Sequence, residues 1–279
     1  MSSISVEGRR LALTNLDKVL WPETGFTKAQ LIEYYVAVAP VLLPHLAGRP
    51  LTVRRFPDGV DGISWHQNEC QGEPDWFPVF ETTGRGGRPL RFCTVDGLPA
   101  LVWLANQAAV ELHPFLWRTD RPREPTQIVF DLDPGPPAGL VECARVALAL
   151  RPLLAELDLE PFVKTTGSLG LHVHAPLSPG LDTKAVARGL AERLAAERED
   201  VVAEMRRSAR EGRVYVDWLQ NDPTRQTVAA YSLRGTAIPT VATPVRWEEL
   251  EERPEQLVFT PEDVLARIER HGDLFAPLA

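Results

Sequence analysis

Two carboxylates at the end of one apolar run constrain this chain more than any other feature. Asp131 and Asp133 stand two residues apart, at the end of the apolar run 127–130, and Pro134 and Gly135 follow them. In a strand, residues two apart share a face, so both carboxylates point the same way. Because proline and glycine stop the strand, we expect the pair at a sheet edge, open to substrate.

A second apolar run, 214–216, ends at Asp217 and predicts a third carboxylate at the same site. Carboxylates that lie this close together on one sheet face repel each other unless one is protonated or a cation lies between them. Three carboxylates suit Mg²⁺ or Mn²⁺ and a phosphate-bearing substrate, because such metals hold the attacking and leaving oxygens. The pattern therefore predicts a divalent-metal site at Asp131, Asp133 and Asp217.

The segment 164–172, with the sequence KTTGSLGLH, is typical of an anion-binding turn. Its glycines let backbone amides approach an anion, and the hydroxyls of Thr166 and Ser168 add donors. A cationic His172 would meet a phosphate just after the turn. A plain β-hairpin with an incidental histidine is the alternative, but the preceding carboxylate strand favours phosphate binding.

A zinc hydrolase is the main rival interpretation. His172 and His174 share a face of one strand, and an HxH pair with aspartates is able to bind zinc. His113 is the one plausible third histidine, and it lies far away in sequence.

Strands and helices are interleaved irregularly, which predicts an α/β or α+β fold with mixed sheets. Thr27 should cap the first helix, and Pro40 and Pro44 should bend or shorten it. The segment 81–89 is expected to be a loop. The expected helices are about 27–45, 101–112, 139–157, 183–197, 202–210 and 261–271, and the expected strands are 51–56, 127–133, 161–166, 171–176, 214–217 and 227–233.

Composition sets further bounds. With 279 residues and 44% hydrophobic residues, the chain can form one large domain or two small ones. We see no run long enough to cross a membrane and no secretion signal. The scattered Cys70, Cys93 and Cys143 suit reduced thiols in a cytosolic protein.

The net charge of −8 argues against a general nucleic-acid coat but allows a local basic surface. Ordinary solvated faces are the plainer explanation for each basic cluster. These clusters are the arginines at 54 and 55, at 85, 88 and 91, at 118, 121 and 123, and at 206, 207, 210 and 213.

Two other patterns favour contacts with nucleic acid. Lys18 and Lys28 frame an aromatic turn, 19–27, and are able to hold a terminal phosphate. Trp65 and His66 follow a glycine turn and are able to stack on bases, although most tryptophans are core residues.

As an ordered set, the motifs resemble the polymerase domain of bacterial non-homologous end-joining DNA ligases, a branch of the archaeo-eukaryotic primase superfamily. They extend over about residues 13–250 and are LDKVLWP with GFTK, RPLTVRRFPDG, ELHPF, FDLDPG, KTTGSLGLHV, GRVYVDWLQN and YSLRGTAIPTVATPVRWEEL. The resemblance implies that residues 1–279 form one two-lobed primase-polymerase domain with an RRM-like catalytic sheet. It also implies template-directed addition of nucleotides, with ribonucleotides preferred, to primer 3′ ends at gaps or breaks.

The resemblance also implies roles for single residues. Two Mg²⁺ or Mn²⁺ ions on Asp131, Asp133 and Asp217 would activate the primer 3′-hydroxyl and carry the triphosphate. Lys18 and Lys28 would read a DNA 5′-phosphate, and Trp65 and His66 stand where the family has a phenylalanine pair that stacks on the template. The implied nucleotide-binding residues are Arg54, His113, Thr166, Ser168, His172, Arg210, Gln220, Ser232 and Arg234.

The chain departs from the family at three usual lysines, which are Asn68, Leu169 and Gln226 here. Fewer cations predict weaker binding of phosphates. A non-catalytic module that binds DNA ends is therefore one alternative, and a metal-dependent phosphoesterase is another.

The implied partners are gapped or broken DNA with a 5′-phosphate and nucleoside triphosphates. The chain has no KxDG ligase signature, so a separate DNA ligase and a Ku-like end-binding protein are expected partners. The expected location is the cytoplasm, at the nucleoid and not at a membrane.

Overall fold

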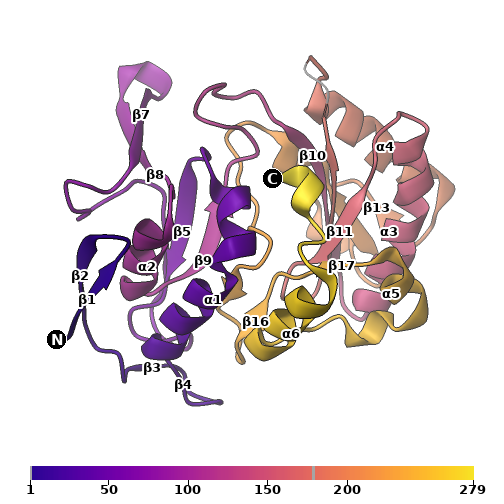
Figure 1. Cartoon of the computed structure of the whole chain (residues 1–279). Helices are drawn as coiled ribbons and strands as arrows, with labels where there is room; N and C mark the ends of the chain where they lie inside the picture. The colour runs from indigo at the N-terminus through magenta and orange to yellow at the C-terminus, as the bar shows by residue number, and fades with distance from the viewer. Residues whose placement is uncertain (1, 178–179) are drawn as a thin grey trace.

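The computed structural model describes residues 2–177 and 180–279 and shows two lobes, each built on one sheet (Figure 1). The C-terminal lobe holds β10 (Gln127–Pro134), α3 (Leu140–Ala155), β11 (Phe162–Thr165), β12 (Leu171–Pro176), α4 (Thr183–Glu197) and β14 (Val214–Asp217). Its central strands are ordered β14-β10-β12-β11 and pair antiparallel. This is the βαββαβ arrangement of RRM-like sheets, so the expected fold class is confirmed. The short strands β13 (Val201–Val202) and β17 (Pro244–Val245) extend the two edges.

The alternation of side chains along β10 separates the core from the site. Phe130 and Leu132 belong to the core that α3 and α4 complete. Asp131 and Asp133, one residue out of phase, therefore lie on the opposite face. Each carboxylate thus rests on a strand that buried neighbours hold rigidly.

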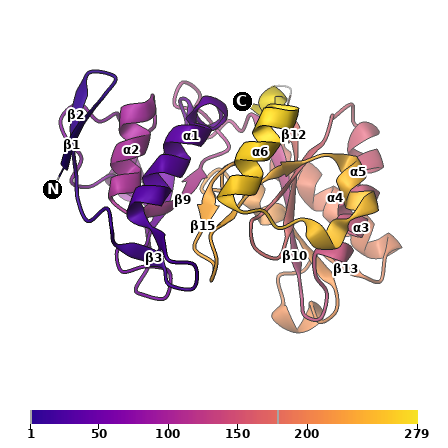
Figure 2. The same ribbon diagram turned by 60° about the horizontal axis from the view of Figure 1, so that its bottom comes forward.

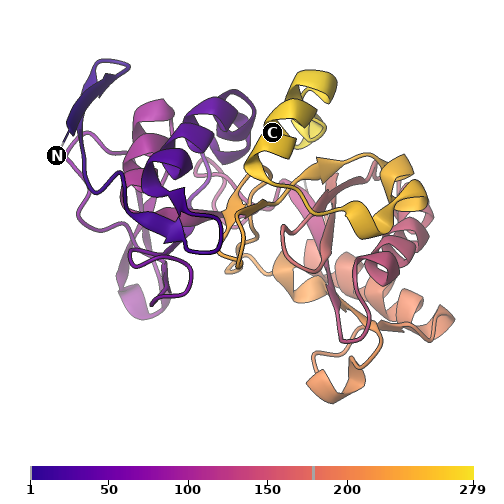
Figure 3. The ribbon, with the colours of Figure 1, turned by 90° about the horizontal axis from the view of Figure 1, so that it is seen from below.

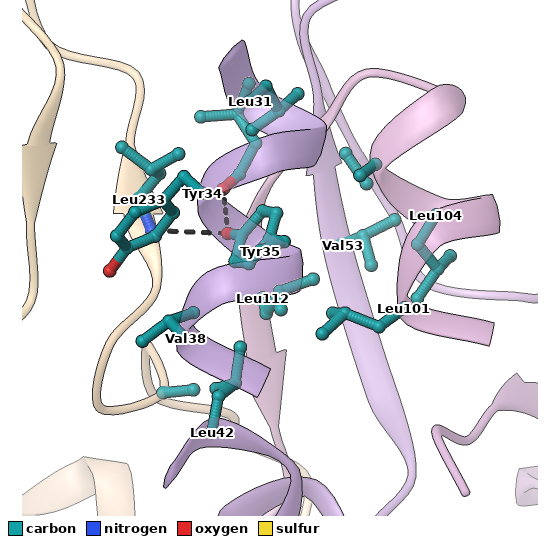
Figure 4. Close-up of a cluster of buried hydrophobic side chains, with 14 of the residues drawn as sticks. Leu31, Tyr34, Tyr35, Val38, Leu42, Val53, Leu101, Leu104, Leu112 and Leu233 are labelled. Atoms are coloured by element: carbon teal, nitrogen blue, oxygen red, sulfur yellow. Dashed lines mark hydrogen bonds between the residues drawn. The ribbon is translucent and has the colours of Figure 1, made fainter. Parts of the chain in front are cut away.

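The N-terminal lobe is built on β5 (Leu51–Arg55), which pairs with β6 (Trp65–Gln67), β8 (Pro89–Cys93) and β9 (Ala109–Pro114), while β7 (Val79–Thr83) pairs with β8. The helices α1 (Lys28–Leu46) and α2 (Leu98–Asn106) pack together beside this sheet (Figure 4). Tyr35 of α1 donates to the carbonyl of Val110 at 2.6 Å and accepts from the amide of Leu233 at 3.2 Å. Its hydroxyl therefore ties α1 to β9 and to β15 (Leu233–Arg234).

Thr27 caps α1 as expected, through a capping box with Gln30. Pro40 and Pro44 do not shorten the helix, so that part of the prediction is wrong. Both prolines lie on its exposed side, where water reaches the carbonyls that a proline leaves without a donor. In the described chain, α1 is also the one helix long and apolar enough to cross a membrane. Its inner residues fill the core of this lobe, which accounts for its composition.

The end of the chain returns to the junction of the lobes. The helices α5 (Trp247–Glu252) and α6 (Pro261–His271) follow β17, and α6 lies between the two lobes in Figure 2. Val264, Phe275 and Leu278 join the core around α1. The remaining elements are the pairs β1 (Ser2–Val6) with β2 (Arg9–Leu13), β3 (Val19–Trp21) with β4 (Phe26–Thr27) and β15 with β16 (Thr240–Val241), and the 3₁₀ turns Arg85–Gly87, Arg207–Ala209, Trp218–Asn221, Pro254–Gln256 and Ala276–Leu278.

Four local predictions are wrong or partly wrong. The expected helix 101–112 ends at Asn106, and β9 begins after a turn at Ala108, whose φ is +54°. The expected helix 202–210 holds only the end of β13 and a 3₁₀ turn. The expected loop 81–89 is confirmed at 84–88, which connect β7 and β8, but 81–83 and 89 belong to those strands. The expected strand 227–233 is reduced to its last residue. Each error concerns a short segment whose structure depends on distant pairing, which local composition does not encode.

The expectation of three reduced thiols is also wrong. Cys70 and Cys93 form a disulfide, with their Cα atoms 4.8 Å apart, and Cys143 is buried as a free thiol. The amide of Cys70 donates to the carbonyl of Arg91, which places the segment before β7 alongside β8. A separation of 23 residues gives no sign of this proximity.

Candidate active site

β10 and β14 bring the three predicted carboxylates together. Their antiparallel register places Asp131 directly opposite Asp217 and Asp133 opposite Tyr215. Residues opposite each other across a ladder share a face of the sheet, as do residues two apart. All three acids therefore lie on the face that the core leaves open, as their spacing predicts.

Burial and mutual repulsion favour the protonated form of these acids. Burial raises the pKa of Asp131 to about 6, against the opposing charge of Lys164. Burial and then the charges of Asp131 and Asp217 raise the pKa of Asp133 to about 7. Burial is also the largest cause that raises the pKa of Asp217. A divalent cation would relieve this repulsion, so the donor set fits a hard metal ion.

The carboxylate oxygens of Asp131 and Asp217 differ in the hydrogen bonds that they accept. Oδ1 of Asp131 is buried and forms no well-aligned hydrogen bond in the described chain, although His172 Nε2 lies 3.1 Å away. By contrast, Asp217 caps the 3₁₀ turn after β14, and its Oδ1 accepts from the Leu219 amide at 2.9 Å and from Tyr215 Oη at 3.2 Å. No three His, Cys, Asp or Glu side chains within the described ranges are grouped tightly enough to hold a metal ion as they stand.

A cavity of about 500 Å³ opens beside Asp131 and Asp133. Its walls come from both lobes, because His66 and His113 belong to the N-terminal sheet. Polar and charged side chains predominate in the lining of this cavity. The lining residues are His66, His113, Asp131, Asp133, Pro134, Thr166, Ser168, Leu169, Gly170, His172, Arg210, Gln220, Gln226, Thr227, Val228 and Arg234.

The glycine turn between β11 and β12 forms one wall. Oγ1 of Thr166 accepts from the amides of Ser168 and Gly170, both at 3.2 Å. These two amides therefore bind the threonine rather than face the cavity as phosphate donors. A Cβ at Gly170 would lie 2.3 Å from the carbonyl oxygen of Leu132. This position requires glycine because the turn packs directly against β10.

His172 faces Asp131, with Nε2 lying 3.1 Å from Oδ1. Burial, and then the charges of Lys164 and Arg234, lower the pKa of this imidazole well below its ordinary value. The cationic histidine expected from the sequence is therefore wrong for this structure. A neutral imidazole still offers one donor and one acceptor to a substrate.

Glu111 holds a second group of site residues in place, and sequence reasoning missed it. Oε2 lies 2.9 Å from His113 Nε2, and Oε1 accepts from the Gly235 amide at 3.0 Å. Arg54 and Arg234 each bring a guanidinium nitrogen to 3.5 Å from Oε1. Although burial opposes it, the hydrogen bond from His113 and the charge of Arg234 lower the pKa of Glu111 to about 2.

The signal for Glu111 is its position two residues before His113, which places both on one face of a strand. That signal is lost when 101–112 is taken as a helix.

Lys164 also escaped sequence reasoning as a site residue. It is 1% exposed, and its Nζ has no hydrogen-bond partner among the described residues. It lies directly opposite His172 in the β11–β12 register. Burial, and then the charge of Arg234, lower the pKa of this lysine to about 7.

Arg210 and Gln220 reach the cavity from the segments on either side of β14. The guanidinium of Arg210 lies 3.7 Å from the ring centre of Tyr215, and Gln220 Nε2 donates to Oδ2 of Asp217 at 3.3 Å. Ser232, by contrast, is fully buried outside the cavity, where its Oγ accepts from the Leu112 amide. The structure therefore does not bring Ser232 to the site.

Lys18 and Lys28 lie side by side, since the amide of Lys28 donates to the carbonyl of Lys18. Lys28 is buried, and its Nζ donates to the Thr14 carbonyl at 2.7 Å. Burial, and then the charges of Arg55 and Lys18, lower its pKa to about 8. Lys18 remains more exposed and pairs with Asp58 at 2.9 Å.

Trp65 and His66 do not form one platform. Neighbours on a strand point to opposite faces, and His66 lines the cavity with its ring 5.6 Å from that of His113. Trp65 instead lies under the guanidinium of Arg55, 5.4 Å from its ring centre, and is 41% exposed.

The histidines do not support zinc. His174 is buried, with Nδ1 lying 3.0 Å from Gln127 Oε1, and lines a small interior cavity rather than the one beside Asp131. Leu169 and Gln226, two of the three positions at which the sequence resemblance implies lysine, line the main cavity, and Leu169 is 66% exposed. Asn68, at the third of these positions, follows directly after β6.

Residues 27–275 match the family model described as the primase-polymerase domain of LigD. The chain is 40% identical over 277 residues to the multifunctional non-homologous end joining protein LigD of Mycolicibacterium smegmatis, which covers 96% of this chain and 36% of that protein. It is 32% identical over 269 residues to the bifunctional non-homologous end joining protein LigD of Bacillus subtilis. This match covers 94% of this chain and 43% of that protein. The chain thus spans less than half the length of these relatives.

Among solved structures, the polymerase domain from Mycobacterium tuberculosis Ligase D in complex with DNA matches with a TM-score of 0.91 and 40% identity. The match covers 96% of this chain and 98% of that one.

Proposed function

The chain belongs to the LigD primase-polymerase family, and from this premise we propose that it extends primer 3′ ends at gaps or breaks in DNA by template-directed nucleotidyl transfer. The observation that carries this proposal is the Asp131–Asp217 pairing at the edge of a cavity lined by His113, Arg210 and Arg234. The cavity has room for a nucleotide, and its cations suit a triphosphate.

Asp131 and Asp133 would hold divalent metal, Mg²⁺ or Mn²⁺, and Asp217 would complete the set. Bound there, such ions activate the attacking hydroxyl and steady the leaving pyrophosphate. His172 keeps a neutral imidazole beside Asp131, and Thr166 fixes the turn that forms the cavity wall. Arg210 and Arg234 would neutralise phosphate charge as it develops.

DNA ends would be read on the N-terminal lobe. We propose that Lys18 and Lys28 hold the 5′-phosphate of a gap or break, supported by their contact and by the nearby charge of Arg55. Trp65, exposed beneath Arg55, would stack on template bases, whereas His66 would face the incoming nucleotide. Ribonucleotides would be preferred, with His113 placed at the sugar.

The wider setting is proposed on the same premise. The chain would act at the nucleoid in the cytoplasm, on DNA ends brought together by a Ku-like protein, and a DNA ligase would seal the product.

Primer extension on gapped DNA tests the proposal. Asp131→Ala should abolish extension while binding of 5′-phosphorylated gapped DNA is kept, and the exposed acid Asp96, changed to alanine, provides the control. Lys18→Ala with Lys28→Ala should erase the preference for a 5′-phosphate, whereas Lys184→Ala should not. Undiminished extension by Asp131→Ala would exclude this mechanism.

A further inference from the structure

A second basic pocket lies between α5 and α6, away from the carboxylates. It has a volume of about 210 Å³, and four arginines and one histidine line it, with one acid. Figure 3 shows α6, in yellow, on the opposite side of the molecule from the orange segment after β13 that carries Arg210. We call this the α5–α6 pocket. Its ionisable residues are Arg246, Glu249, Arg253, Arg267, Arg270 and His271.

The floor of the pocket is a fixed ion pair. Arg267 donates to both oxygens of Glu249, at 2.6 and 2.8 Å, and to the carbonyl of Pro244 at 3.3 Å. Oε2 of Glu249 also accepts from the Arg246 amide at 2.8 Å. The only acid in the lining is therefore already neutralised, and its partner is held in one orientation.

The rim keeps its positive charge. Arg253 and Arg270 are exposed and form no ion pair within residues 2–177 and 180–279. Arg246 lies 3.7 Å from Glu249, which Arg267 has already bound. The lining of the pocket therefore holds two arginines that no acid of the described chain neutralises, although α5 and α6 themselves carry several acids outside the lining.

The charges within the pocket also act on one another. Burial, and then the charges of Arg246 and Arg267, lower the pKa of His271. An anion would relieve this mutual repulsion, because guanidinium groups bind phosphate in a bidentate way. The volume suits one or two phosphate groups rather than a base pair.

We propose that the α5–α6 pocket binds a phosphate group, supplied by a nucleic-acid backbone or by a free phosphorylated ligand, at a site separate from the polymerase cavity. Arg253, Arg270 and His271 would contact the phosphate from the rim. The Arg267–Glu249 pair would hold α5 and α6 at the separation that the contact needs.

The test compares Arg253→Gln/Arg270→Gln with Arg145→Gln/Arg188→Gln, which removes the same two charges from exposed positions on α3 and α4. Calorimetry would measure binding of inorganic pyrophosphate in one arm. The other arm would use a blunt duplex without a gap, a primer or a 5′-phosphate, at several salt concentrations.

We expect the pocket variant to weaken binding by about tenfold in at least one arm, and the control by less than about twofold. Loss with pyrophosphate alone would identify a free ligand. Loss with duplex, with a salt slope smaller by about two, would identify the nucleic-acid backbone. Equal binding by both variants in both arms would overturn the proposal. The readout is independent of primer extension, which the pocket variant should retain.

Discussion

Glu111 and His113, two residues apart on β9, are joined by a contact of 2.9 Å between Oε2 and Nε2 at the wall of the polymerase cavity. The same carboxylate lies within 3.5 Å of the guanidinium nitrogens of Arg54 and Arg234. One buried charge thus orients three residues to which the family resemblance assigns nucleotide contacts. His66 and His113 are the N-terminal residues that line the cavity, and Glu111 holds His113 in place from behind the cavity wall.

Glu111→Gln should weaken nucleotide binding more than it slows the chemical step. The amide keeps the shape but loses the charge that holds two guanidinium groups. We expect KM for nucleotide to rise about tenfold with a smaller change in kcat, and the free energy of unfolding to fall by about 2–4 kcal/mol. Steady-state extension and urea unfolding would measure the two effects.

The control is Glu248→Gln, on the exposed side of α5. A proportional fall in kcat with KM unchanged would contradict the positioning role of Glu111.

In the absence of metal, Asp131 and Asp133 should make the protein less stable as pH rises. Their folded-state pKa values, about 6 and about 7, exceed the ordinary value of 3.8. The folded chain therefore binds more protons than the unfolded chain between about pH 4 and pH 7. The contribution of these two acids to the free energy of unfolding is most favourable below about pH 4, and it is lost as pH rises from about 4 to about 7. Mn²⁺ favours the charged carboxylates, so its gain in Tm should grow from about pH 5 to pH 8.

Calorimetric scans of the wild type and of Asp131→Asn/Asp133→Asn, with and without Mn²⁺, would isolate this contribution from that of other groups. A Mn²⁺-dependent gain of equal size in the double variant would place the metal elsewhere.

Sequence reasoning located the carboxylates because a strand has a fixed period of two, and Asp131, Asp133 and Asp217 all end apolar runs. It also located Thr166 and His172, whose turn has a local glycine pattern. It missed Glu111 because the segment 101–112 was expected to be a helix, which hides that Glu111 and His113 share one face of β9. It missed Lys164 because the role of that lysine depends on burial, which only the packing of the fold creates. It grouped Trp65 with His66, although neighbours on a strand diverge. The disulfide between Cys70 and Cys93 depends on long-range pairing that no local pattern encodes.

Lys164→Met should shift the pH dependence of extension upward. The ammonium lowers the pKa of Asp131, so its removal should leave that acid protonated to a higher pH. The fold should lose little stability, because the buried Nζ has no hydrogen-bond partner in the described chain and methionine fills a similar volume. The measurement is the rate of extension across pH 5 to 9 at saturating Mg²⁺. We expect the profile to shift upward by about half a pH unit. An unshifted profile would show that Lys164 does not act on Asp131.

Gly170→Ala should damage the fold and the site together. A Cβ there would lie 2.3 Å from the carbonyl oxygen of Leu132, which is backbone between Asp131 and Asp133. Either β10 or the turn must move, so we expect a loss of about 2–4 kcal/mol in the free energy of unfolding and a loss of extension even where the variant is fully folded.

Gly189 provides the matched control, because it lies within α4 and a Cβ there meets nothing within 4 Å. Gly189→Ala should stabilise the protein by about 0.5–1 kcal/mol and leave extension unchanged. Equal effects of the two substitutions would show that the turn does not pack against β10 as tightly as the structure indicates.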